Sequence, residues 1–342
     1  MGKRHALHFY QYTPRANVLA VSSPDADERK WAVENLEGVK VYSDYEEMLS
    51  HEGLQAVVIA SVTSVHAEQA IKAIQKGLHV LSEKPLSTNV EISQSVVDAR
   101  NAVAKKYPDQ KVMCGFSRRF DASYRDAFAK MSSGAYGEPA VFHSRTCDMY
   151  DKSGFFVAYA QFSGGIFVDC SIHDIDLALW FFGEDSKVKS VQAVGITAVH
   201  PELRQHNDRD NAVATIEFYG EKVASLYCCR MMAAGQEDFT EVICKKGTLA
   251  VNMQGRKNHT EIHDSYGIRR EIPQTYYDRF KDAFLTEANE FTACCLDNTE
   301  EPVKLEGAVK AVRIGAALQE SLITGNKIFF DENGNRIDRA KL

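Results

Sequence analysis

The sequence lacks several features typical of membrane, secreted and nucleic-acid-binding proteins. No uninterrupted apolar run reaches the ~18 residues that a transmembrane helix needs. The eight cysteines include no C-x-x-C spacing, which fits reduced thiols in a cytoplasmic protein better than a disulfide or zinc framework. Asp and Glu (47) outnumber Lys and Arg (40), and the formal charge of −7 argues against nucleic acid or an anionic membrane as a partner.

With 342 residues, the chain is long enough for two domains, since single cores stop growing at roughly 250–300 residues. Residues 17–117 alternate apolar, β-branched runs such as NVLAV and QAVVIAS with helical stretches. This alternation predicts βαβ units with right-handed crossovers. We therefore expect an α/β dinucleotide-binding domain over residues 1–118, with a doubly wound (Rossmann) parallel sheet.

The pattern changes after residue 118. A Gly-Gly pair introduces the helix VDCSIHDIDLALWFFG, and the runs VKSVQAVGITAV, AVATIEFYG and KVASLYCCRMM then follow almost without helices. Consecutive strands of this kind predict an α+β domain with a largely antiparallel sheet over residues 119–342.

The stretch SEKPLS is a first candidate for chemistry. It places Lys84 at the carboxyl end of a strand, where open α/β sheets bind their ligands. The following proline cannot donate to the sheet and therefore ends the strand. A turn carrying a solvated charge pair is the alternative interpretation.

The stretch GGIFVDCSIHDIDLALW is more specific. Asp169, His173 and Asp176 stand at positions i, i+4 and i+7, so one helix would carry all three on one face. Three interpretations are open: a metal site, a core histidine satisfied by a carboxylate, and a general base held by a carboxylate. The chain shows no obvious companion cluster of metal ligands, so we expect no metal.

Two further stretches are weaker signals. Ser61 to His66 form the loop after a buried strand, although His66 could equally be an ordinary residue of a first helical turn. Arg118 and Arg119 follow another strand end, where ordinary surface charge is the alternative.

Taken in order along the chain, these stretches resemble the glucose–fructose oxidoreductase/inositol dehydrogenase family, and within it the inositol 2-dehydrogenases. The E-K-P triplet combined with D-x-x-x-H-x-x-D carries the resemblance, which extends to YYDRFKDAFLTEANEF near the end. The resemblance implies a dehydrogenase that transfers a hydride between a nicotinamide cofactor and a secondary alcohol of a polyol, inositol or sugar-like substrate. It also implies that the first domain binds the cofactor and the second shapes the substrate pocket.

The resemblance assigns catalytic roles to Lys84, Asp169 and His173. His173 is suited to accept the hydroxyl proton near neutral pH, and Lys84 would polarise the substrate oxygen. Asp169 would orient the imidazole or bind the hydroxyl. The expected cofactor-binding residues are Gly2, Ser23, Ser61, Val62, His66, Glu83 and Lys84, and the expected substrate-binding residues are Arg118 and Asp176.

The sequence departs from the family at the end of the second Rossmann strand. The acidic residue that holds the ribose of NAD is replaced by Ser23, with Arg29 and Lys30 downstream. The cofactor is therefore expected to be NADP or NAD, with NADP favoured. Around HSRTCD, a histidine-bearing pattern of the inositol enzymes is missing, so the substrate could be another polyol, sugar or cyclic hydroxy compound.

The beginning of the chain is a further departure. MGKRHA matches the end of the family's G-x-G-x-x-G-x-x-H stretch, so that Gly2 corresponds to its third glycine and the first strand is expected upstream of Met1. If the cofactor site is instead impaired, the chain could be a sugar-sensing or regulatory binding protein; a lyase or epimerase that oxidises transiently is another alternative. Retention of Lys84, Asp169 and His173 favours the dehydrogenase. We expect a cytoplasmic homo-oligomer, a dimer or tetramer, assembled through the sheet of the second domain.

Overall fold

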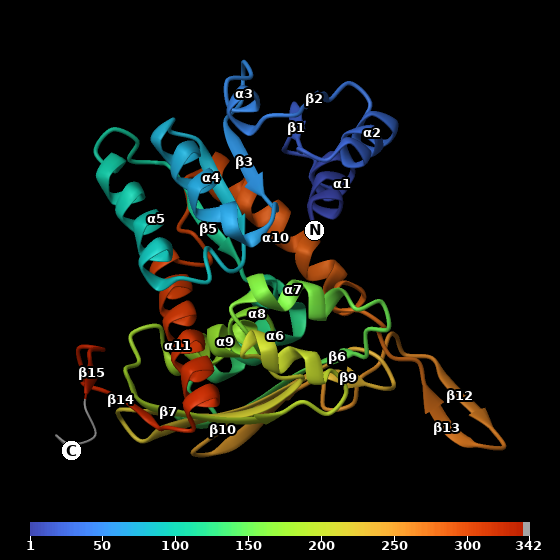
Figure 1. Cartoon of the computed structure of the whole chain (residues 1–342), viewed down its shortest axis with the longest axis vertical. Coiled ribbons are helices and arrows are strands. Elements are labelled where there is room, and N and C mark those ends of the chain that lie inside the picture. The colour runs from blue at the N-terminus through green and yellow to red at the C-terminus, as the bar shows by residue number, and fades with distance from the viewer. Residues whose placement is uncertain (338–342) are drawn as a thin grey trace. The chain divides into compact units, whose positions relative to one another are not determined.

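The computed structural model describes residues 1–337 and divides into two compact units (Figure 1). The first unit contains Met1–Phe120 and Asp282–Val309, and the second contains Asp121–Lys281 and residues 310–337. The boundary near residue 120 lies close to the expected one at 118/119. The division differs in one respect, because a late segment belongs to the first unit.

The first unit contains two parallel sheets. β1 (Ala20–Ser22) pairs with β2 (Lys40–Tyr42), whereas β3 (Ala56–Ile59), β4 (His79–Glu83) and β5 (Val112–Gly115) form a three-stranded sheet in that order. This confirms the predicted Rossmann-type parallel architecture. Within residues 1–337, however, no strand joins β1 to β3, and the pair β1–β2 lies apart from β3–β5 in Figure 1.

Helices alternate with these strands, as predicted. They are α1 (Gly2–Tyr12), α2 (Ala26–Asn35), α3 (Tyr45–Met48), α4 (Thr63–Gln75), α5 (Val90–Val103) and the 3₁₀ turn η1 (Ser117–Phe120). The side chains of Asp25, Asp44 and Asn89 accept hydrogen bonds from first-turn N–H groups and so cap α2, α3 and α5. These caps explain why the helices begin where they do.

The late segment contributes to the core of the first unit. It comprises the end of α10 (Tyr276–Asp297) and the start of α11 (Leu305–Thr324). The rings of Phe284 and His5 pack nearly perpendicular to each other with centroids 5.8 Å apart, and Asn289 donates a hydrogen bond of 3.1 Å to the carbonyl of Tyr12. These contacts join residues more than 270 positions apart, which explains why the strand and helix pattern did not predict them.

The second unit is built on an eight-stranded sheet in the order β11-β10-β6-β9-β8-β7-β14-β15. Its strands are β6 (Pro139–Met149), β7 (Val188–Ile196), β8 (Asn211–Phe218), β9 (Lys222–Met232), β10 (Glu237–Cys244), β11 (Gly247–Val251), β14 (Ile328–Phe330) and β15 (Arg336–Ile337). β6 and β9 are parallel and the other neighbours are antiparallel. The predicted α+β domain with a largely antiparallel sheet is thereby confirmed.

Helices cover one face of this sheet (Figure 1). They are α6 (Ala122–Ser132), α7 (Phe155–Ser163), α8 (Ile166–Asp169), α9 (Ile172–Phe182), η2 (Pro201–His206) and the second half of α11. Every residue of α9 is buried except Trp180, and Ser321 of α11 accepts a hydrogen bond from the backbone of Ala193 on β7. The opposite face carries exposed valines, including Val194 and Val213, which are direct partners on β7 and β8.

A separate hairpin of β12 (Glu261–Asp264) and β13 (Gly267–Arg270) projects from the second unit (Figure 1). All eight of its strand residues are exposed. None of the helices described in residues 1–337 is long and apolar enough to cross a bilayer.

Candidate functional site

The sequence motifs fall on both units. In the first unit, the E-K-P triplet lies at the end of β4, whose last residue is Glu83. The Glu83 carboxylate is buried, accepts a hydrogen bond of 2.7 Å from Nε2 of His5, and accepts a second from the backbone N–H of Lys84. Burial by itself raises the pKa of Glu83, but the hydrogen bond and charge of His5 outweigh it and lower the pKa below its ordinary value. Glu83 therefore holds α1 against the end of β4.

A second buried carboxyl group, Glu287 of α10, lies close to Glu83. Its Oε1 atom and the Cα of Glu83 are both 3.6 Å from the point that a Cβ of Gly115 would occupy. Neither carboxyl oxygen of Glu287 accepts a hydrogen bond from a described residue. Burial, and secondly the charge of Glu83, raise the pKa of Glu287 well above its ordinary value. Sequence reasoning missed this group, because α10 carries no pattern that marks it.

The loop after β3 packs beside the turn after β4. His66 is buried in α4, with Nδ1 2.9 Å from the carbonyl oxygen of Pro85 and Nε2 3.0 Å from that of Ser61. Val62, at the start of α4, is 67% exposed. A Cβ added to Gly2 would lie 3.8 Å from the carbonyl oxygen of Ala60, so α1 begins at the end of β3. The structure thus gathers Gly2, Ser61, Val62, His66, Glu83 and Lys84 at the carboxyl ends of β3 and β4.

The end of β1 differs from the expectation for the ribose-binding position. Ser23 donates a hydrogen bond of 2.6 Å to the carboxylate of Glu28, and Arg29 donates to the carbonyl oxygens of Ser23 and Pro24. A carboxylate from the first turn of α2 therefore lies at the end of β1, although the strand itself is followed by serine. A carboxylate at this place would repel a 2′-phosphate, so the absence of an acidic residue at position 23 is no reason to favour NADP.

In the second unit, Asp169 and His173 do not share one regular helix. Asp169 is the last residue of α8, and α9 begins at Ile172. The backbone N–H of Ser171 bonds to the carbonyl of Ile166, a five-residue step of the π type that interrupts the regular turn. The predicted single helix is therefore interrupted between Asp169 and His173, whereas His173 and Asp176 both lie on α9.

Glycine fixes the start of α8. Gly165 has φ of +90°, and a Cβ there would lie 2.1 Å from the Gln319 side chain of α11. Only glycine can adopt this conformation in such close contact with α11. The Gly-Gly pair thus sets the position of the segment that ends in Asp169.

Arg230 of β9 lies next to Asp169. Its guanidinium is fully buried, 2.8 Å from Oδ2 of Asp169 and 3.2 Å from Oδ2 of Asp208, and it stacks 5.0 Å from the ring centre of Phe156. Burial lowers the pKa of Arg230, but the two carboxylates outweigh it and raise the pKa. Arg230 was missed by sequence reasoning because the contact spans 61 positions and its strand shows only an ordinary apolar pattern.

His173 is buried and stacks on Tyr276 of α10, with ring centroids 4.9 Å apart. The next residue, Asp174, accepts hydrogen bonds from hydroxyl groups of β6 and of the turn before α9, and so fastens the first turn of α9. These donors are Ser144 (2.6 Å), Thr146 (2.8 Å) and Ser171 (3.1 Å). Tyr276 and Asp174 were not singled out from the sequence.

The remaining candidates are also buried. Arg118 in η1 is 1% exposed, as is Asp176 of α9, so neither is an ordinary surface charge. No group of three or more His, Cys, Asp or Glu within residues 1–337 is arranged to hold a metal ion.

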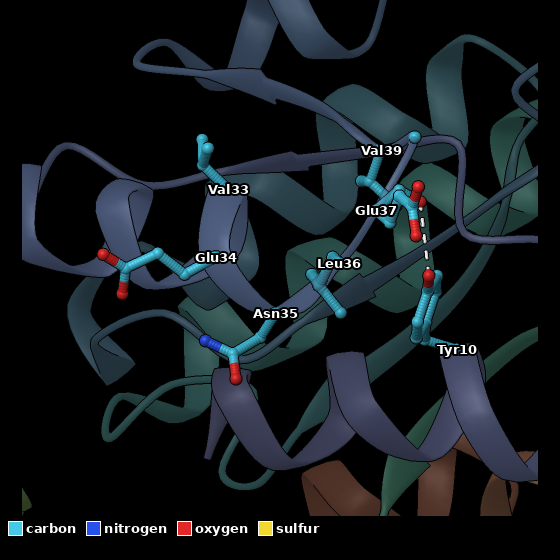
Figure 2. A pocket seen from close by; sticks show the side chains of 8 residues that line it. Tyr10, Val33, Glu34, Asn35, Leu36, Glu37 and Val39 are labelled. Atoms are coloured by element: carbon cyan, nitrogen blue, oxygen red, sulfur yellow. Dashed lines mark hydrogen bonds between the residues drawn. The ribbon is translucent and has the colours of Figure 1, made fainter.

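A hollow of about 580 Å³ lies elsewhere in the first unit (Figure 2). It is formed by Tyr10 of α1 and by residues 33–39, and the Tyr10 hydroxyl donates to the carbonyl oxygen of Glu37. Residues 33–39 precede β2, so the hollow is at the amino end of that strand. Parallel sheets bind ligands at the opposite end, and we assign the hollow no role in the candidate site.

Comparison with known proteins defines the class. Residues 1–107 match the oxidoreductase family with an NAD-binding Rossmann fold, and residues 124–250 match the GFO/IDH/MocA C-terminal domain. Together with the parallel and mixed sheets, these matches define a two-domain oxidoreductase.

Similarity extends along the whole chain. It is 30% identical to scyllo-inositol 2-dehydrogenase (NAD(+)) of Bacillus subtilis, over 97% of this chain and 94% of the relative, and 27% identical to myo-inositol 2-dehydrogenase of Thermotoga maritima, over 93% and 92%. The structure of scyllo-inositol dehydrogenase from Lactobacillus casei with NAD(H) and scyllo-inositol superposes with a TM-score of 0.89, at 30% identity and over 96% and 95% of the two chains. The chain belongs to the GFO/IDH/MocA oxidoreductase family.

Proposed function

We propose that the protein is a nicotinamide-dependent dehydrogenase that oxidises a secondary alcohol of an inositol or a related polyol. The similarity to inositol dehydrogenases along nearly the whole chain is the observation that supports this proposal best. The nicotinamide, when bound, supplies the hydride acceptor. The carboxyl ends of β3 and β4 suit such a ligand, because helix α1 begins beside them. The first residue of α1 is Gly2, so no side chain covers the start of the helix.

We assign the proton chemistry to three side chains. His173 accepts the hydroxyl proton, Lys84 stabilises negative charge on the substrate oxygen, and Asp169 binds the hydroxyl or orients the imidazole. Arg118 and Asp176 contribute to substrate binding. Burial of His173 against Tyr276 supports its role, because a base shielded from water keeps a defined orientation.

The catalytic assignment is tested by NADH formation at 340 nm with myo-inositol, scyllo-inositol and a panel of sugars. We expect His173→Ala and Lys84→Met each to lower kcat by about 10²–10⁴-fold with little change in cofactor affinity. His263→Ala and Lys130→Met are controls, because both side chains are exposed. No turnover with any polyol or sugar would reject the dehydrogenase, and normal turnover of His173→Ala would leave that histidine a structural role.

We further propose NAD as the preferred cofactor, with Glu28 in the role of the acidic residue that binds the ribose. Its carboxylate is held by the Ser23 hydroxyl at the end of β1, where it would repel a 2′-phosphate. Arg29 already donates to two loop carbonyls, which reduces its capacity to compensate. This replaces the expectation that NADP is favoured.

The cofactor proposal predicts that Glu28→Gln shifts the ratio of kcat/KM for NADP⁺ to that for NAD⁺ upward by about tenfold or more, since one repulsive charge is removed. Glu34→Gln on the same helix is the matched control, because Glu34 is exposed and lies away from Ser23. A ratio that is equal in the two variants would place the ribose elsewhere.

We also propose that the protein is a homo-oligomer, a dimer or tetramer, in a reducing compartment such as the cytoplasm. The open face of the large sheet supports assembly, because a row of Val194, Val213, Tyr227, Arg145 and Phe239 crosses five neighbouring strands on it. All eight cysteines are free thiols, which is consistent with a reducing compartment.

A further inference from the structure

A buried ion cluster holds both ends of the short helix α8. At the start of α8, the backbone N–H of Ile166 donates a hydrogen bond of 2.8 Å to Oδ1 of Asp208. At its end, Oδ2 of Asp169 accepts from Nη2 of Arg230 at 2.8 Å. Nη1 of Arg230 bonds to the other oxygen of Asp208 at 3.2 Å, which closes the chain of contacts.

The cluster is rigidly embedded. The side chains of Arg230 and Asp208 are fully buried, and the backbone N–H of Arg230 also bonds to the carbonyl oxygen of Asp210. Asp208 accepts a further hydrogen bond from the backbone N–H of Arg209. Loop 208–210, strand β9 and helix α8 are thus connected through one guanidinium group.

We propose that Arg230 and Asp208 are positioning residues that set the orientation of the catalytic Asp169 by clamping α8 at both ends. The inference rests on the role proposed for Asp169. The Asp169 side chain is 17% exposed, so the clamp fixes one carboxylate oxygen inside the protein while part of the carboxylate stays accessible. A carboxylate held in this way keeps one direction, which substrate positioning requires.

The clamp also sets the local charge. With Arg230 in place, the two carboxylates and one guanidinium carry a net charge of −1; without it they would carry −2. The proposed function puts Asp169 and His173 on the same substrate hydroxyl. Additional negative charge at Asp169 would then favour the imidazolium, so loss of Arg230 would move the acid limb of the kcat/KM pH profile to higher pH. A purely structural role of Arg230 predicts no such movement.

The test compares Arg230→Met, Arg230→Lys and the isosteric Asp208→Asn, in case loss of the buried guanidinium prevents folding. We expect Arg230→Met to lower kcat by about 10²-fold, with NAD affinity unchanged and the acid limb raised. Arg230→Lys should return the acid limb to its wild-type position with an intermediate kcat, since charge but not the fork geometry is kept. Hydrogen exchange of residues 164–171 should accelerate in Arg230→Met and in Asp208→Asn.

Arg279→Met is the matched control. The contacts of Arg279 are an ion pair of 2.8 Å with Asp121 and a stack over the ring of Phe280, and both partners lie outside α8. The proposal would be overturned if α8 exchanged as slowly in Arg230→Met and Asp208→Asn as in wild type. It would also be overturned if the pH profile and kcat of Arg230→Met matched those of Arg279→Met. Hydrogen exchange does not need substrate. It therefore tests whether Arg230 and Asp208 hold α8 even if the wild-type protein is inactive on every polyol and the proposed function fails.

Discussion

Glu287 shows at the scale of one residue how burial controls a carboxyl group. It is fully buried on α10 beside the ionised Glu83, and no described residue donates a hydrogen bond to it. Its raised pKa means that the folded protein favours the neutral acid. The contribution of protonated Glu287 to the free energy of unfolding is therefore complete below the ordinary pKa near 4.5. It is lost as the pH rises through the pKa of Glu287 in the folded state.

We therefore predict that Glu287→Gln, which is neutral at every pH, becomes more stable than wild type as the pH rises. The free energy of unfolding of wild type should fall relative to the variant by up to about 1.4 kcal/mol per pH unit above pH 5. Urea unfolding at pH 4.5, 6, 7.5 and 9 measures the difference. Glu52→Gln is the control, because that carboxylate is exposed, and parallel curves for wild type and Glu287→Gln would contradict the prediction.

Residues in local motifs could be found from the sequence, whereas their partners could not. Lys84, Asp169 and His173 stand in short patterns at the ends of apolar runs. His5 and Arg230 contact Glu83 and Asp169 across 78 and 61 positions, and no local pattern encodes such a pairing. Glu28 stands in the first turn of the helix after β1, five positions beyond Ser23, and only the folded chain brings its carboxylate to that residue.

At the scale of elements, the first unit holds two separate parallel sheets, and β1 and β3 each stand at an edge of their own sheet. β1 pairs with β2 and β3 with β4, and in a doubly wound sheet one strand lies between the positions that β1 and β3 occupy. Buried backbone groups that lack a partner cost roughly 1–3 kcal/mol each. Regular strand and helix signals predicted β1, β3, β4 and β5 of this unit and the longer helices between them. They did not predict β2 or the short helix α3, because three or four residues are too few to show a period.

An engineered parallel strand should therefore join the two sheets. We predict that about a dozen added residues, an apolar strand ending in G-x-G-x before Met1, raise the melting temperature and the affinity for NAD. The control extension has the same length with prolines in the strand, which cannot join a sheet ladder. Equal melting temperatures and NAD titrations for both extensions would show that the edges do not accept a strand.

At the scale of the whole molecule, the open face of the eight-stranded sheet is the candidate for self-association. Val194 and Val213 are 62% and 45% exposed and directly opposite each other. Exposed apolar patches of this kind commonly mark interfaces. We predict that wild type has a mass two or four times 38.2 kDa in light scattering, and that Val194→Glu combined with Val213→Glu reduces it. Val33→Glu, on α2 and 68% exposed, should leave the mass unchanged, and a monomeric wild type would contradict the prediction.

The contribution of residues 282–309 to the first unit has a consequence for synthesis on the ribosome. The amino-terminal unit is made first, yet the helical segment that carries Phe284 and Asn289 emerges only when most of the chain has been translated. At about 5–20 residues per second, the nascent unit waits on the order of ten seconds or more for this part of its core. During that interval the surface around His5 is uncovered, so we expect chaperones that bind nascent chains to engage this unit before the carboxyl-terminal helices arrive.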